Sequence, residues 1–248
     1  MKTFIKLILQ RVLGFERYLF LFSLFIIKKL KWDRNERDFL HFLELLPEKG
    51  VVLDIGANLG VMSYYLASDS DRRLVYAFEP VACNFENLLK IRNRYALSNL
   101  KCYQLALGEE DGEIEMVLPV QRSVKFHGLA HVKHESIQEM NEGEFITCPV
   151  KRLDNFEPLL AEQGRLTGIK IDVENYEYHV LKGADKLLRQ HSPVIYCELW
   201  ENENRTKTME LLRKLNYRAM VLESKRLVPY RPGVHTTQNF FFIPVVSK

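Results

Sequence analysis

The 248-residue chain is 47% hydrophobic and 27% charged, which is the composition of an ordinary globular protein that can bury one full α/β core. Residues 1–31 hold seven basic side chains and one acidic one; subtracting these from 35 basic and 32 acidic residues leaves 28 and 31, about −3. The rest of the chain, residues 32–248, is therefore not basic, which excludes nucleic-acid binding through a general positive charge. The four cysteines contain no C-x-x-C pair, which favours reduced core thiols over zinc ligands or disulfides and suits a cytoplasmic chain.

The first 31 residues mix basic and apolar side chains and end in the run YLFLFSLFII followed by KKLK. A helix that crosses a membrane needs about twenty apolar residues, whereas this run has ten, and Glu16 with Arg17 interrupts any longer apolar stretch. No small-residue cleavage site follows, so a secretory signal is not expected. Two interpretations remain: a basic amphipathic helix on the inner membrane surface, or a helix that packs on the core or on a partner subunit. If the helix lies on the membrane surface, deletion of residues 1–31 should release the protein from membranes and leave ligand binding intact.

Residues 33–46 have apolar side chains at helical spacing and lead through Pro47 and Gly50 into a first strand. The chain is therefore divided into a helical extension, residues 1–46, and a main domain, residues 47–248.

The most informative stretch is VVLDIGANLG, residues 51–60. It predicts a short buried parallel strand, a glycine turn and a helix N-terminus, where backbone amides can approach a ligand. About twenty residues on, LVYAFEP predicts a second buried strand that ends in Glu79, the position where a βαβ unit holds ribose hydroxyls. The pattern indicates a nucleoside cofactor.

The identity of the nucleoside follows from departures from the dinucleotide pattern. Gly56, Asn58 and Gly60 give G-x-N-x-G in place of G-x-G-x-x-G. Asp54 would repel a diphosphate but suits a ligand with an ammonium group and a sulfonium, as in S-adenosylmethionine. DIGANLG followed by FEP resembles motif I and the acidic ribose position of class I S-adenosylmethionine-dependent methyltransferases, which implies that Asp54, Gly56, Asn58, Gly60 and Glu79 bind this cofactor.

The next elements continue the α/β alternation. Helices are predicted over residues 61–67 and 84–95, and strands over residues 73–78 and 101–106. Ligands bind at the carboxyl ends of such strands, so Ala106 and Leu107 are candidates for the adenine face.

Residues 112–120 and 145–153 alternate like half-exposed strands, around a polar stretch at residues 121–143. This insertion, about residues 112–153, is expected to overhang the cofactor pocket. It contains His127, His131 and His134, for which solvated loop positions are favoured over a metal triad, and no metal site is assigned. A single general base is the more plausible role, and His134 is the candidate.

The second informative stretch is TGIKIDVENYEYHVLKGA, residues 167–184. It predicts a strand that ends in Asp172 and Glu174, followed by a helix. Asp172 is the first candidate for the catalytic base, acting directly or through a cation. Glu174 is either an alternative base, a carboxylate that orients the acceptor, or a cap of the helix.

Together with DIGANLG, FEP, LALG and a leucine-aspartate pair, this stretch resembles the FkbM family of methyltransferases over about residues 50–200. Asn175 stands where the family usually has glycine, and asparagine is the non-glycine residue that best tolerates positive φ. The resemblance implies O-methylation, with S-adenosylmethionine as donor and a hydroxyl of a sugar, glycan or natural product as acceptor. It also implies a Rossmann-like class I α/β fold.

Residues 193–199 predict a fifth strand, and residues 217–222 and 239–245 two more. The expected architecture is one seven-stranded mixed sheet with helices on both faces. Two other functions remain open: an NAD-dependent oxidoreductase, and a non-catalytic cofactor-binding protein held at the membrane by residues 1–31.

Overall fold

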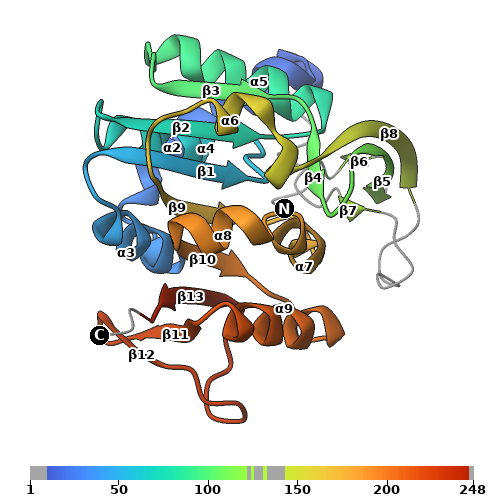
Figure 1. Cartoon of the computed structure of the whole chain (residues 1–248). Coiled ribbons are helices and arrows are strands. Elements are labelled where there is room, and N and C mark those ends of the chain that lie inside the picture. The colour runs from blue at the N-terminus through green and yellow to red at the C-terminus, as the bar shows by residue number, and fades with distance from the viewer. Residues whose placement is uncertain (1–9, 122–123, 126–130, 133–142, 246–248) are drawn as a thin grey trace.

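The computed structural model describes residues 10–121, 124–125, 131–132 and 143–245, and shows a central sheet with helices on both faces (Figure 1). The sheet has eight strands in the order β12-β11-β13-β10-β9-β1-β2-β3. Its strands are β1 (Gly50–Ile55), β2 (Arg73–Phe78), β3 (Leu100–Tyr103), β9 (Leu166–Ile171), β10 (Val194–Glu198), β11 (Tyr217–Glu223), β12 (Arg226–Pro229) and β13 (Asn239–Pro244). The predicted mixed α/β sheet is confirmed.

The five strands from β3 to β10 pair in parallel, whereas β13 pairs antiparallel with β10 and β11. The prediction of seven strands was short by one. The additional strand β12 forms a hairpin with β11 through Ser224 and Lys225, which have φ of 47° and 67°. A two-residue turn with both φ values positive is usually marked by Asn-Gly or Asp-Gly, and Ser224 with Lys225 lacks that signal.

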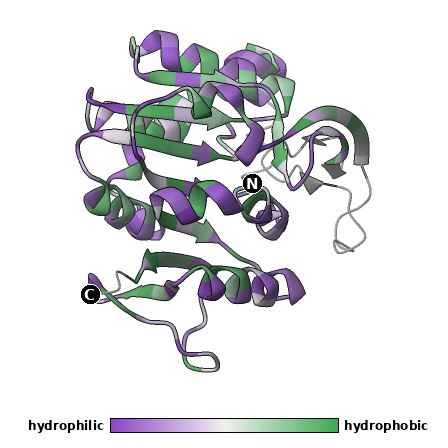
Figure 2. Ribbon diagram, viewed as in Figure 1, coloured by the Kyte–Doolittle hydropathy of each residue, from purple (hydrophilic) through white to green (hydrophobic). Residues whose placement is uncertain are grey.

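The helices are η1 (Arg34–Glu36), α2 (Phe15–Leu30), α3 (Arg37–Leu45), α4 (Val61–Ser68), α5 (Ala82–Arg94), η3 (Leu153–Asn155), α6 (Glu157–Leu160), α7 (Glu177–Lys182), α8 (Asp185–His191) and α9 (Glu203–Lys214). In Figure 2 strands such as β13 are coloured mainly as hydrophobic, whereas the helices carry both colours. Two apolar clusters result, one on each face of the sheet. None of the helices within the described ranges is long and apolar enough to cross a bilayer.

The helical extension packs on the main domain. Phe39 and Phe42 of α3 are fully buried in the same cluster as Val52 of β1. Helix α2 packs against α4 and α5 and buries Ile27 and Leu30. The second interpretation of residues 1–31, a helix that packs on the core, therefore describes one face of α2. Contact with a membrane surface stays a prediction. The division of the chain after residue 46 stays a prediction.

The insertion forms a second, smaller sheet beside the carboxyl ends of the central strands (Figure 1). It consists of β4 (Ala106–Gly108), β5 (Gly112–Gln121), β6 (Val124–Lys125), β7 (His131–Val132) and β8 (Gly143–Arg152). Strands β5 and β8 pair antiparallel from Gly112↔Val150 to Pro119↔Gly143, so the two alternating stretches are strands, as predicted. Strand β4 joins this sheet to the end of β3.

Candidate active site

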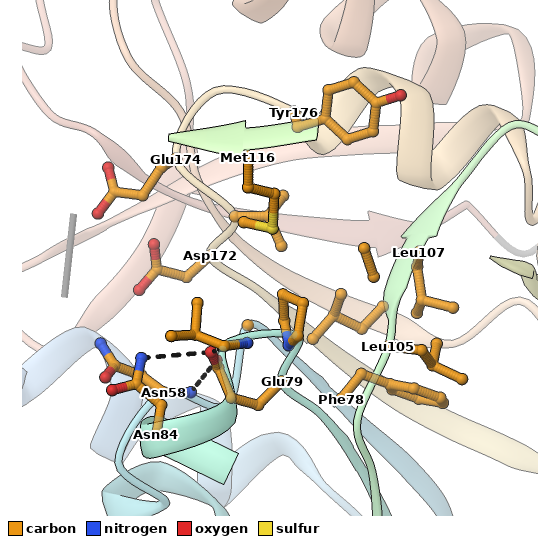
Figure 3. A pocket seen from close by; sticks show the side chains of 16 residues that line it. Asn58, Phe78, Glu79, Asn84, Leu105, Leu107, Met116, Asp172, Glu174 and Tyr176 are labelled. Atoms are coloured by element: carbon orange, nitrogen blue, oxygen red, sulfur yellow. Dashed lines mark hydrogen bonds between the residues drawn. The ribbon is translucent and has the colours of Figure 1, made fainter. Parts of the chain in front are cut away.

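A cavity opens at the carboxyl ends of β1, β2 and β9, where the order of the parallel strands reverses between β1 and β9. This is the place at which ligands bind in open α/β sheets. In Figure 3 Asp172 and Glu174 lie on one side of the cavity, Leu105, Leu107 and Phe78 lie on the other, and Glu79 lies between them. The lining residues are Ile55, Gly56, Asn58, Phe78, Glu79, Pro80, Val81, Asn84, Leu105, Ala106, Leu107, Met116, Asp172, Val173, Glu174 and Tyr176.

The glycine turn after β1 can only be built with glycine at its first position. Gly56 has φ of 75°, and a Cβ there would lie 1.9 Å from the backbone oxygen of Asp172. The amides of Gly56 and Ala57 both donate to the carbonyl of Phe78, at 3.1 and 2.9 Å. The turn is thus fixed between the end of β2 and the loop after β9, which brings the predicted cofactor and catalytic segments into contact.

Gly60 has a different position from Gly56. It precedes α4 with φ of 83°, and a Cβ would lie 2.8 Å from Cδ1 of Leu88 on α5. Gly60 is not among the residues that line the cavity. The structure gives it a packing role between α4 and α5.

Glu79 lies in the middle of the cavity, where three hydrogen bonds fix its carboxyl group. Its Oε2 accepts from the amide of Asn58 at 2.8 Å, while Oε1 accepts from the amide of Val81 at 3.0 Å and from Nδ2 of Asn84 at 3.2 Å. Burial raises the pKa of Glu79 to about 7, against the opposing effect of these donors. The carboxylate is therefore oriented, and its ionisation falls in the physiological range.

Asp54 lies outside the cavity lining, at the buried end of β1. Its carboxylate accepts from the hydroxyl of Ser63 and forms an ion pair with Lys170, Nζ to Oδ1 3.2 Å. Both members of the pair are almost fully buried. Asp54 thus forms an ion pair inside the protein, and its predicted contact with the cofactor stays a prediction.

Lys170 connects the two halves of the site. Its Nζ donates to the carbonyl of Gly56 at 2.8 Å and lies 3.9 Å from Oδ2 of Asp172. Burial alone would lower the pKa of Lys170, but the carboxylates of Asp54 and Asp172 outweigh burial, so its pKa is raised. The lysine remains charged and holds the glycine turn against the strand that carries Asp172.

The loop after β9 is bent by two consecutive residues with positive φ, Glu174 at 51° and Asn175 at 75°. Glu177 accepts hydrogen bonds from the amides of Val173 and Asn175, at 3.2 and 3.1 Å. Asn204 of α9 donates to the carbonyl of Asn175 at 2.9 Å. The turn is thus built without glycine at position 175, and the carboxyl group that accepts from its amides belongs to Glu177.

The two candidate catalytic carboxyl groups differ in their surroundings. The Asp172 side chain is 37% exposed and adjoins Lys170. Burial, followed by the charges of Asp172 and Glu198, raises the pKa of Glu174 to about 8. At neutral pH Glu174 is mostly protonated and can donate a hydrogen bond, whereas an ionised Asp172 would accept a proton.

The opposite wall of the cavity is apolar. Ala106 and Leu107 line it together with Leu105, Phe78 and Met116. Met116 comes from β5, so the insertion contributes to the cavity. The cavity thus combines an apolar wall with the oriented carboxyl group of Glu79.

Seven of the predicted site residues line the cavity, and the sequence reasoning missed others. The seven are Gly56, Asn58, Glu79, Ala106, Leu107, Asp172 and Glu174. His134 lies outside the described residues. Within the described ranges no group of three or more His, Cys, Asp or Glu side chains has an arrangement that could hold a metal ion. Of the missed residues, Met116 carried no signal beyond strand alternation, whereas Lys170 and Glu177 stand within the quoted stretch at residues 167–184.

Comparisons with known proteins address the family of this chain. Residues 54–219 match the family described as the methyltransferase FkbM domain. "Methyltransferase 1" of Beauveria bassiana (strain ARSEF 2860) is 26% identical over 149 residues, which are 56% of this chain and 60% of that protein. The "AMB antimetabolite synthetase AmbE" of Pseudomonas aeruginosa is 29% identical over 171 residues, 57% of this chain and 8% of that protein. The chain thus spans less than two thirds of either relative.

A structural comparison addresses the fold alone. The crystal structure of methyltransferase FkbM from Methylobacillus flagellatus KT superposes with a TM-score of 0.52 at 16% identity, covering 79% of this chain and 44% of that one. The predicted Rossmann-like methyltransferase fold is confirmed.

Proposed function

The chain belongs to the FkbM methyltransferase family, and on this premise we propose that it transfers the methyl group of S-adenosylmethionine to a hydroxyl oxygen of a sugar, glycan or natural-product acceptor. The observation that carries the proposal is the oriented Glu79 carboxylate between an apolar wall and Asp172. Glu79 would hold the ribose of a nucleoside whose base contacts the apolar wall, with Asp172 and Glu174 on the other side of the cavity.

The residues present fit S-adenosylmethionine. Glu79 would bind the ribose hydroxyls, and Ala106, Leu107 and Met116 would contact the adenine. Gly56 lines the cavity, and the turn accepts no side chain there, because a Cβ would lie 1.9 Å from the backbone oxygen of Asp172. When bound, the cofactor supplies an electrophilic methyl group on a sulfonium.

The catalytic contribution of the chain is mainly orientation, because an in-line displacement requires little other chemistry from the protein. Asp172 would accept the proton of the attacking hydroxyl, with Nζ of Lys170 3.9 Å from its Oδ2. Glu174, protonated at neutral pH, would donate a hydrogen bond to a neighbouring oxygen of the acceptor. An acceptor with adjacent hydroxyls, such as a sugar, offers both contacts.

The proposal is tested by calorimetric titration of the protein with S-adenosylmethionine and with NAD, followed by a methyl-transfer screen over hydroxylated acceptors. Binding of the first ligand and not the second is expected; the reverse would restore the oxidoreductase alternative. With an acceptor in hand, Asp172→Asn should lower kcat by about 100-fold or more and leave cofactor affinity nearly unchanged. Asp71→Asn, an exposed position between α4 and β2, is the control. Cofactor binding without turnover on any acceptor would favour the non-catalytic alternative.

A further inference from the structure

Helix α2 has one face that is firmly attached to the domain. Ser23 is fully buried and accepts a hydrogen bond from Nδ2 of Asn87 on α5 at 2.8 Å, and the hydroxyl of Tyr65 on α4 donates to the carbonyl of Ile27. Asn87 also donates to the carbonyl of Leu59 in the loop before α4. The rotation of α2 about its axis is therefore fixed, and so is the face that it turns outward.

The outward face carries large apolar side chains. Leu21 is 49% exposed and Phe25 59%, and Trp32, just beyond the helix, is 84% exposed. Phe22, one residue from Leu21, is 40% exposed. Single exposed apolar residues are ordinary, but Leu21 and Phe25 lie one helical turn apart on the same side of α2, with Phe22 beside them and Trp32 in the turn that follows. We call this set of four residues the outer face of α2.

Cations accompany the outer face. Arg17 and Lys28 are exposed and continue the spacing of Leu21 and Phe25 along the helix, in steps of three or four residues. Lys29 and Lys31 are exposed at the same end as Lys28, Lys29 being paired with Asp33 at 2.9 Å. Aromatic and aliphatic side chains between cations are the combination that binds the interface of a bilayer with anionic headgroups.

We propose that the outer face of α2 docks on an anionic lipid surface, with the helix axis parallel to the bilayer. Charge complementarity selects this occupant over a second copy of the chain, because a twofold contact would bring the cations of one copy toward those of the other. Since the opposite face of α2 is buried, docking leaves the helix on the domain and places the whole enzyme at the membrane surface.

The same packing determines how the proposal must be tested. Removal of residues 1–31 would uncover apolar side chains of the core, so the deletion considered from the sequence would perturb folding as well as lipid binding. Substitutions confined to the outer face avoid this problem. In the full-length chain, Leu21→Gln with Phe25→Gln removes apolar side chains from the outer face. A second variant, Arg17→Gln with Lys28→Gln, removes two positive charges.

The experiment is co-sedimentation of each protein with phosphatidylcholine vesicles that contain or lack phosphatidylserine. The parent protein should bind the anionic vesicles more tightly, and binding should weaken with added salt. The variant with Leu21→Gln and Phe25→Gln should have a partition coefficient at least about tenfold lower than the parent. The variant with Arg17→Gln and Lys28→Gln should lose about fivefold for each cation removed. Leu160→Gln with Val234→Gln, and Arg213→Gln with Lys214→Gln, change equally exposed side chains elsewhere and should have no effect.

Absence of binding to anionic vesicles by the parent protein would overturn the proposal, as would equal loss in the outer-face and control variants. If the parent protein is a dimer in solution, and Leu21→Gln with Phe25→Gln converts it to monomers, the outer face binds a second copy of the chain and not a lipid surface. The assay contains no methyl donor or acceptor, so its outcome is independent of the proposed enzymatic function.

Discussion

Replacement of Glu79 by glutamine tests the cofactor site at its centre. The carboxylate accepts three hydrogen bonds, from the amides of Asn58 and Val81 and from the side chain of Asn84. Glutamine keeps one acceptor oxygen but turns an NH₂ group toward one of these donors or toward the ribose. Loss of hydrogen bonds to a charged acceptor costs about 1.5–3 kcal/mol, so Kd for S-adenosylmethionine should rise about 10- to 150-fold.

The pKa of Glu79 adds a second signature. With a pKa of about 7, the group is about one-eleventh ionised at pH 6 and about ten-elevenths ionised at pH 8. If the ribose binds the ionised form, Kd of the parent protein should fall about tenfold over this range. The glutamine variant has no such group and should bind with the same Kd at both pH values.

The assay is calorimetric titration at pH 6, 7 and 8, with circular dichroism to establish that the variant is folded. Glu198→Gln is the matched control, because burial raises the pKa of Glu198 to about 7 as well but this residue does not line the Glu79 cavity. The control should keep the affinity and the pH dependence of the parent. A Glu79→Gln protein that binds within about twofold of the parent, or that retains the tenfold pH dependence, would refute the reasoning.

Three further substitutions test the supports of the site. Gly56→Ala should abolish cofactor binding and lower the thermal midpoint, because its Cβ would lie 1.9 Å from a backbone oxygen, whereas Gly112→Ala, with open space around it, should do neither. Glu177→Gln should flatten the stability profile: burial raises its pKa to about 8, so the folded state retains a proton that the unfolded state loses above about pH 4.5. The free energy of unfolding of the parent thus falls by up to about 1.4 kcal/mol per pH unit between about pH 4.5 and 8. In urea unfolding, the variant should be more stable relative to the parent at pH 8 than at pH 5. The same change of stability with pH in both proteins would contradict this. Lys170→Met should cost about 3–5 kcal/mol by leaving Asp54 buried without its cation, and exposed Lys214→Met almost nothing, as measured by the same unfolding.

The part of the site that could be predicted from sequence is the part built from local patterns. The strand, glycine turn and helix around Gly56 arise within ten residues, and Glu79 follows a buried strand of recognisable composition. The fold class follows from the same alternation. These elements depend on burial and backbone conformation, which the local sequence largely determines.

The sequence is least informative where a residue far along the chain decides the environment. It predicts that Asp54 binds the cofactor, and it gives no sign of the ion pair with Lys170, more than a hundred positions along the chain. The role of Gly60 depends on Leu88 of another helix, and Met116 enters the cavity only because β5 folds over it. The strand β12 was missed because residues with ordinary propensities adopt its turn. Such contacts have no signature in one sequence.

The central claim is that the cavity binds S-adenosylmethionine with its ribose on Glu79 and its reactive end beside Asp172. A crystal structure of the protein with the demethylated product, S-adenosylhomocysteine, tests it most directly. We expect both ribose hydroxyls within hydrogen-bond distance of the Glu79 carboxylate, adenine against Ala106 and Leu107, and the sulfur toward Asp172. A ligand bound elsewhere, or bound here with its adenine on the side of Asp172, would show that the cavity does not bind the cofactor in this way.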